Sequence, residues 1–222
     1  MTDTGALHPV QDGSGGSTMG GGSGVGGMGG GSGMGGRVIA VLRGSDGRFL
    51  LPASRVLMDA GLRLEVQLPT PGALDVIEAL DGAGAGTVIT RSDAADAIAA
   101  GASFLVTPGV MTDAIRYGTD HGVPVYAGAL TPTEVWDAHR AGATFVKVFP
   151  AASVGPGYIS ALRQPFPEPK YVAVGGIKLA QAPEYLAAGA VAVGADAPLV
   201  GDVLTSGDLD GLRDRALAWA VL

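Results

Sequence analysis

The sequence of 222 residues has no cysteine, only three lysines and three histidines, and few aromatic residues (5%). The lack of cysteine excludes a disulfide scaffold, an iron–sulfur site, a thiolate zinc site and a cysteine nucleophile. Asp and Glu (21) outnumber Lys and Arg (14), and the net charge of −7 disfavours nucleic acid and anionic membranes as partners. No apolar run approaches the roughly 18 residues of a membrane span, and no secretory signal is visible at the start of the chain. We therefore expect a cytoplasmic protein.

Glycine is abundant but unevenly spread, because residues 13–36 hold 15 of the 38 glycines. Such a segment cannot bury enough apolar surface to offset the entropy lost on ordering its backbone. Residues 1–36 are therefore predicted to form a flexible Gly/Ser/Met-rich tail, and residues 37–222 one folded domain. A phosphate-binding loop is the alternative for the glycines, but no GK[ST] follows them and the first strand pattern comes after them.

A short phrase recurs from Arg37 onward, in which a helical pattern closes with glycine and an apolar run begins. Glycine is the usual residue just past a helix end, where the backbone turns left-handed. The spacings of 40, 21, 20 and 47 residues correspond to single and double units of about 20–24 residues, which is typical of βα units and a parallel sheet. The glycines are Gly61, Gly101, Gly122, Gly142 and Gly189.

Eight apolar runs fit this period, which predicts an α/β fold, the closed (β/α)8 TIM barrel. A doubly wound open sheet is the alternative. At 186 residues the barrel is short, and Gly-Ala-Gly-Ala-Gly is poor strand material, so we expect an irregular third unit. The predicted strands are 37–43, 62–68, 84–89, 102–107, 123–127, 144–149, 171–174 and 191–194.

Lys147 is the most informative polar residue, because it lies in the middle of the apolar strand Phe145-Val146-Lys147-Val148-Phe149. A buried ammonium group is costly, so burial favours a neutral amine that can attack a carbonyl and form a Schiff base. Alternatively, this lysine is structural, paired with a carboxylate or extended to the strand end.

Glu65 lies on the second predicted strand, opposite Lys147 on the sixth in a ring of eight. If Leu64 and Val66 face the helices, Glu65 and Gln67 face the barrel axis. An amine and a carboxylate in one cavity suit imine chemistry, in which the carboxylate moves protons. A plain Glu65–Lys147 ion pair with no active site is the alternative.

Further candidates follow the ends of other strands, where barrels bind substrate. Arg43 is a candidate for binding a carboxylate or phosphate, although a surface arginine is equally common there. Thr87 follows two glycines and is a candidate donor to the same anion. Gly175 and Gly176 follow the seventh strand, where backbone N–H groups often bind phosphate.

Asp196, after the eighth strand, would repel such a phosphate, or it caps the next helix instead. The histidines lack metal-ligand spacing, and we expect no metal and no cofactor.

These residues resemble the family of 2-keto-3-deoxy-6-phosphogluconate (KDPG) and 4-hydroxy-2-oxoglutarate aldolases over essentially all of 37–222. The resemblance rests on VIAVLRG, LEVQLPTPGAL, GAGTVIT, LVTPGV, GALTPTEV, VKVFPAASVGPGYISALR and AVGGI. It implies a class I aldolase on a (β/α)8 barrel, commonly a homotrimer, that splits a 2-keto-4-hydroxy acid into pyruvate and an aldehyde. By position, Lys147 resembles the Schiff-base lysine and Glu65 the general acid/base. Arg43 and Thr87 resemble contacts to the substrate carboxylate, and Phe149 resembles a pocket wall.

The chain departs from the family pattern at two places that bear on substrate. Ala173-Val174-Gly175-Gly176-Ile177 replaces the usual Pro-Thr-Gly-Gly-[Val/Ile] and is similar to the 2-dehydro-3-deoxy-6-phosphogalactonate branch, as is VLRG. Asp196-Ala197 stands where the family has Gly-Ser, a phosphate contact. We therefore expect an aldolase for a 2-keto-3-deoxy-6-phospho sugar acid or for an unphosphorylated acid such as 4-hydroxy-2-oxoglutarate. A catalytically silent barrel that serves as an assembly or binding subunit is the alternative.

Overall fold

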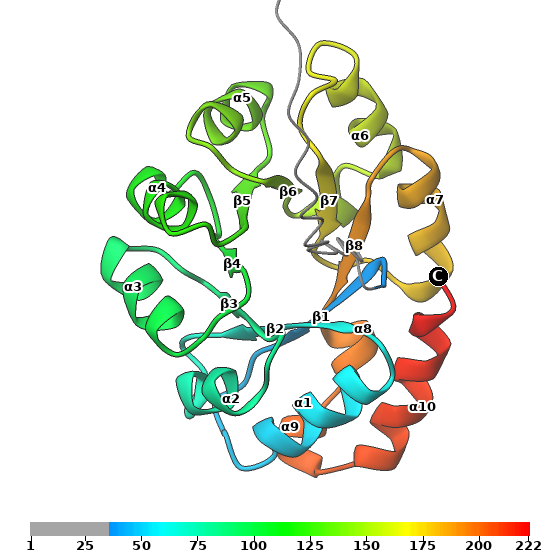
Figure 1. Ribbon diagram of the computed structural model, residues 1–222. Coiled ribbons are helices and arrows are strands. Elements are labelled where there is room, and N and C mark those ends of the chain that lie inside the picture. The colour runs from blue at the N-terminus through cyan, green and yellow to red at the C-terminus, as the bar shows by residue number, and fades with distance from the viewer. Residues whose placement is uncertain (1–35) are drawn as a thin grey trace, which may run out of the picture. The chain divides into compact units, whose positions relative to one another are not determined.

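In the computed structural model, which describes residues 36–222, eight parallel strands close into a barrel in chain order (Figure 1). The predicted (β/α)8 barrel is confirmed, and the open doubly wound sheet is wrong. Apart from Gly36, the predicted tail of residues 1–36 lies outside the described residues. The strands are β1 (Val38–Leu42), β2 (Arg63–Gln67), β3 (Gly84–Gly86), β4 (Leu105–Val106), β5 (Val125–Ala129), β6 (Phe145–Val148), β7 (Tyr171–Val174) and β8 (Ala192–Ala195).

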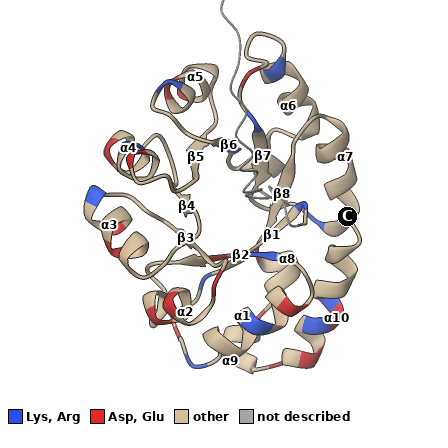
Figure 2. Ribbon diagram, in the orientation of Figure 1, with Lys and Arg blue, Asp and Glu red and all other residues tan. Residues whose placement is uncertain are grey.

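Helices surround the barrel and carry most of the charged residues, as Figure 2 shows. None of the helices within residues 36–222 is long and apolar enough to cross a bilayer. The helices are α1 (Leu50–Asp59), α2 (Ala73–Ala79), α3 (Arg91–Ala99), α4 (Thr112–Asp120), α5 (Pro132–Arg140), α6 (Pro156–Arg163), α7 (Ala182–Ala187), α8 (Ala197–Val200), α9 (Val203–Ser206) and α10 (Leu209–Ala220). Two 3-10 turns, Ala151–Ser153 and Leu179–Gln181, precede α6 and α7.

The helix boundaries follow local sequence chemistry. The five glycines of the recurring phrase all have positive φ, between 71° and 103°, where a side chain would be strained. Thr131 caps α5. Its hydroxyl accepts a hydrogen bond from the Glu134 N–H (3.3 Å), while the Glu134 carboxylate accepts one from the Thr131 N–H (2.7 Å).

Two cores sit on the two faces of the strands. Leu64 and Val66 belong to the outer core between barrel and helices. Inside the barrel, Tyr126 stacks on Phe145 with ring centroids 4.3 Å apart, and Phe104 lies 5.3 Å from Tyr126. These aromatic residues stand near the N-terminal ends of their strands, so they fill that half of the barrel and leave the C-terminal half free for polar groups.

The third unit is irregular, as predicted. Strand β3 has three residues instead of the predicted 84–89, because Thr87 turns into the left-handed region (φ 58°) and ends it. Strand β4 is also shorter than the predicted 102–107. The glycines of β3 have a packing reason: a Cβ on Gly84 would lie 2.3 Å from the Phe104 ring.

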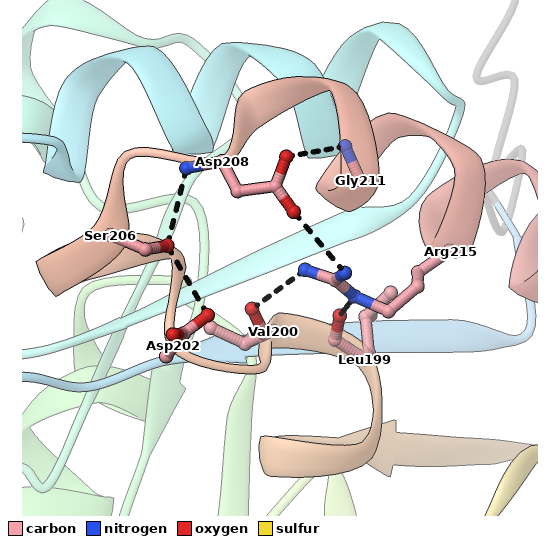
Figure 3. Close-up of polar contacts among 7 residues, drawn as sticks. All are labelled: Leu199, Val200, Asp202, Ser206, Asp208, Gly211 and Arg215. Atoms are coloured by element: carbon pink, nitrogen blue, oxygen red, sulfur yellow. Dashed lines mark hydrogen bonds and ion pairs between the residues drawn. The ribbon is translucent and has the colours of Figure 1, made fainter.

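The last helix of the chain, α10, stabilises the segment that follows β8. Helix α10 packs against α1 and α8. From α10, Arg215 Nε donates to the Leu199 carbonyl (2.7 Å), and its Nη2 donates to the Val200 carbonyl (3.2 Å), as Figure 3 shows. A cation that binds the last carbonyls of a helix stabilises that end, so Arg215 holds α8 directly after β8.

Gly84→Ala is expected to lower the free energy of unfolding by about 1–3 kcal/mol, because the added methyl overpacks the buried Phe104 ring. Gly157→Ala in α6 is the matched control, since nothing lies within 4 Å of its added Cβ, and Ala favours a helix over Gly. Urea unfolding of both variants measures the difference. A Gly84→Ala protein as stable as Gly157→Ala would contradict the packing role of β3.

Candidate active site

A cavity of about 260 Å³ opens at the C-terminal ends of the strands, where (β/α)8 enzymes bind substrate. Its lining comes from residues on four strands (β1, β2, β6 and β7) and from residues that follow β1, β3, β4, β6 and β8. The lining residues are Val41, Arg43, Gln67, Thr87, Pro108, Lys147, Phe149, Val174 and Asp196.

Lys147 points into the barrel, as predicted. Its neighbours Val146 and Val148 belong to the outer core, so alternation turns Lys147 to the interior. The side chain is 7% exposed and reaches the cavity, and its Nζ lies 5.3 Å from the centroid of the Phe149 ring. No ion pair involves this amine within residues 36–222, so the carboxylate pairing of the structural alternative is not formed there.

Glu65 also faces the interior, below the cavity floor that Gln67 lines two residues further along β2. It is 2% exposed, and its Oε1 has no hydrogen-bond partner among the described residues. Burial raises the pKa of Glu65. The positive charge of Lys147 and the side chain of Gln67 lower this pKa, and the negative charge of Asp196 raises it further. Glu65 and Lys147 thus act on each other electrostatically inside one barrel without forming the direct ion pair that was the alternative.

Gly86 makes room for the Glu65 carboxyl. A Cβ on Gly86 would lie 2.2 Å from Glu65 Oε1, so any side chain there would displace the carboxyl. The next residue, Thr87, lines the cavity with left-handed backbone, and its hydroxyl donates to Gln67 Oε1 at 3.0 Å. The roles of Gly86 and Gln67 were missed from sequence, although the glycines flanking Ala85 and the inward register of Gln67 were visible there.

Arg43 and Asp196 stand at the cavity mouth with opposite charges. Arg43 is exposed, and both residues also line a smaller adjoining cavity of about 110 Å³. They form no ion pair with each other or with any other described residue. Asp196 occupies the N-cap position of α8, but its side chain accepts no capping hydrogen bond, so the alternative that this aspartate caps the helix is wrong.

Phe149 forms one wall of the cavity and is 42% exposed. Gly175 is buried behind it: a Cβ there would lie 2.9 Å from the Phe149 ring, and φ is 101°. Gly176 is exposed, with φ 75°. Neither glycine lines the cavity, so the structure brings Lys147, Arg43, Thr87 and Phe149 together around it and places the two glycines behind and beside it.

A second cavity, of about 130 Å³, lies at the opposite end of the barrel. Its polar side chains are Arg37, Arg63 and Tyr126, and Arg63 Nη1 donates to the Tyr126 hydroxyl at 2.6 Å. Among the described residues that line this second cavity there is no carboxylate and no lysine, in contrast to the cavity at the C-terminal end. Within residues 36–222 no group of three or more His, Asp or Glu side chains is arranged to hold a metal ion.

A buried lysine and a buried carboxyl in the interior of a (β/α)8 barrel, with the lysine reaching the cavity at the C-terminal ends of the strands, suit the class of lysine-dependent, Schiff-base aldolases. Residues 34–214 match the family model described as KDPG and KHG aldolase, so the chain belongs to this family. The function predicted from the sequence, a class I pyruvate aldolase, is confirmed, and the catalytically silent barrel is not favoured.

Named relatives agree with this assignment. The chain is 36% identical over 159 residues to a 2-dehydro-3-deoxy-phosphogluconate aldolase of Treponema pallidum (68% of this chain, 76% of the relative). It is 34% identical over 167 residues to a 2-dehydro-3-deoxy-6-phosphogalactonate aldolase of Escherichia coli K12 (71% and 81%). Among solved structures, a KDPG aldolase from Legionella pneumophila with pyruvate captured as a covalent carbinolamine superimposes with a TM-score of 0.76 at 29% identity (83% and 94%).

Glu65→Gln removes the buried ionisable group with little change in volume. Because burial raises the folded-state pKa above 4.5, the stabilising contribution of Glu65 is fully present below pH 4.5 and is lost as pH rises through the folded pKa. The stability of Glu65→Gln relative to the unchanged protein, measured as the difference in their free energies of unfolding, is therefore expected to be greater at pH 8 than at pH 5.

Urea unfolding at both pH values measures this difference. Glu78→Gln, at an exposed position on α2, is the matched control for the loss of one carboxylate. A relative stability of Glu65→Gln that stays constant, or shifts in the opposite direction, would show that the carboxyl is not held protonated by burial.

Proposed function

We propose that Lys147 is the Schiff-base lysine of this aldolase and Glu65 its general acid and base. The observation that carries the proposal is the pair itself: an amine that reaches the cavity, and beneath it a buried carboxyl whose pKa is raised and whose Oε1 is unpartnered. A carboxyl with a raised pKa holds and releases a proton closer to neutral pH than an exposed one, as proton transfer in both directions requires.

The first half of the reaction joins enzyme and substrate. The neutral Lys147 amine attacks the C2 carbonyl of a 2-keto-4-hydroxy acid to give a carbinolamine. The carbinolamine hydroxyl takes a proton, delivered by Glu65, and leaves as water, and a protonated imine remains. Glu65 is then a carboxylate and is ready to accept a proton.

The second half breaks the carbon–carbon bond. Loss of the C4 hydroxyl proton, taken up by Glu65 through water, turns that oxygen into the carbonyl of the departing aldehyde. The C3–C4 electron pair moves into the protonated imine, which becomes an enamine. Protonation at C3 and addition of water then release pyruvate and restore Lys147.

The residues around this pair hold the substrate in place. In the proposal, the Arg43 guanidinium binds the substrate carboxylate. It places a positive charge at the cavity and has no ion-pair partner among the described residues. When substrate binds, the Thr87 hydroxyl redirects its hydrogen bond from Gln67 Oε1 to the same end of the substrate. Phe149 closes the cavity over the amine. Beyond the wall that Phe149 forms, the backbone N–H groups of Gly175 and Gly176 are proposed to donate hydrogen bonds to the substrate.

The substrate is proposed to be a 2-keto-3-deoxy sugar acid of the gluconate or galactonate type, or 4-hydroxy-2-oxoglutarate. The two relatives named above are called aldolases of phosphorylated acids of the first type, which supports a sugar acid of this carbon skeleton. The proposed location of the protein is the cytoplasm, as expected from its sequence.

Borohydride reduction in the presence of pyruvate is expected to attach one reduced pyruvyl group to Lys147, detected by peptide mass analysis. The other lysines, Lys170 and Lys178, are exposed and serve as internal controls. Lys147→Met is expected to abolish both the adduct and turnover, whereas Lys170→Met retains both. A protein that pyruvate and borohydride leave unmodified would refute the proposed chemistry.

A homotrimer is the proposed assembly. It rests on the family resemblance and is supported by large apolar side chains left exposed on the described surface, such as Ile89 (49%) and Trp136 (39%). Light scattering of the full chain is expected to give about three times the chain mass of 22.0 kDa. A mass equal to one chain would contradict this assembly.

A further inference from the structure

The carboxylate of Asp196, at the mouth of the candidate active site, takes part in no interaction that stabilises the fold. Asp196 is half-buried and lines both the main cavity and the adjoining one. Its side chain makes neither a capping hydrogen bond nor an ion pair with a described residue. A half-buried carboxylate that faces a cavity without a protein partner is available to a ligand.

The backbone keeps this carboxylate in place. The Asp196 carbonyl accepts hydrogen bonds from the N–H groups of Leu199 (2.9 Å) and Val200 (2.8 Å). Arg215 then holds the carbonyls of the same two residues from α10 (Figure 3). Residue 196 is therefore fixed between β8 and an anchored helix, and its charge stays at the cavity.

The charges around the cavity do not suit a substrate with two anionic ends. The only cationic groups on the lining, within the described residues, are Arg43 and Lys147. In the proposed function, Arg43 binds the substrate carboxylate and Lys147 becomes the protonated imine. No side-chain cation of the lining remains for a second anion, and the N–H groups of Gly175 and Gly176 lie outside the lining. A phosphate dianion near this mouth would meet the Asp196 carboxylate in a partly water-excluded space.

We infer that Asp196 is a specificity-determining residue that selects substrates whose distal end is uncharged and hydroxylated, the unphosphorylated 2-keto-3-deoxy sugar acids. Hydroxyl groups donate to a carboxylate, so the same group that repels phosphate binds a polyol end. This inference rests on the proposed function and adds the substrate class to it. The carbon–carbon chemistry is unchanged, because the distal end lies outside the bonds that form and break.

The aldol direction tests the inference directly. Pyruvate is supplied with glyceraldehyde, with glyceraldehyde 3-phosphate or with glyoxylate, which give an unphosphorylated sugar acid, its 6-phosphate and 4-hydroxy-2-oxoglutarate. The unchanged full-length protein is expected to show a kcat/KM for glyceraldehyde at least about tenfold above that for either anionic aldehyde. A higher kcat/KM for glyceraldehyde 3-phosphate or glyoxylate would overturn the inference.

Two variants assign the preference to Asp196. Asp196→Asn keeps the shape without the charge, and Asp196→Ser removes the charge and shortens the side chain. Each is expected to shift the ratio of kcat/KM values toward glyceraldehyde 3-phosphate by about tenfold or more. Asp210→Asn is the matched control, because Asp210 is exposed on α10 and pairs with Arg213, and it is expected to leave the ratio unchanged. An unchanged ratio in both Asp196 variants would also overturn the inference.

Imine trapping with pyruvate alone separates this failure from failure of the proposed function. The trapping reaction has no distal group, so it is expected to succeed equally in the unchanged protein, in Asp196→Asn and in Asp210→Asn. Normal trapping with a preference for the phosphorylated aldehyde rejects the role of Asp196 and leaves the Schiff-base chemistry standing. Absence of trapping in the unchanged protein rejects both.

Discussion

The main constraint on the interior of the barrel is that a carboxyl and an amine share it, away from most water. Glu65 is almost fully buried, the charge of Lys147 acts on it, and Oε1 of the carboxyl has no hydrogen-bond partner among the described residues. An unpaired buried polar group is costly, and the raised pKa of Glu65 reflects this cost. Gly86 leaves the space that the carboxyl fills. A larger residue in place of Gly86 would displace the Glu65 carboxyl, so a glycine of the irregular third unit also leaves room for the candidate active site.

The two ends of the barrel have different tasks. Packed aromatic rings fill the N-terminal half. The free energy gained by burying them offsets the cost of polar groups elsewhere in the interior. The C-terminal half holds a cavity whose lining comes from seven of the eight strands or the residues that follow them. The division lets the strands stabilise the fold at one end while the loops vary the ligand at the other.

The residues proposed for chemistry and those proposed for specificity lie at different depths of the barrel. Lys147 and Glu65 lie within the ring of strands, where their positions depend on strand register. Arg43 and Asp196 lie at the mouth, after the last residues of β1 and β8. Asp196 is nevertheless held firmly, because Arg215 ties the helix that follows it to α10. A change of residue at the mouth can thus alter the accepted substrate without disturbing the buried pair.

The sequence by itself determined the barrel, its order of units and the inward register of Lys147 and Glu65, because helix-ending glycines and strand alternation are local signals. It overestimated β3 and β4, whose ends are set by the left-handed Thr87 and by neighbouring strands. Only the tertiary structure decided that Lys147 and Glu65 form no ion pair, that Gly86 accommodates the carboxyl, and that Asp196 faces the cavity instead of capping α8. These outcomes depend on distances between residues far apart in the chain, and side-chain contacts of that kind leave no periodic pattern in a single sequence.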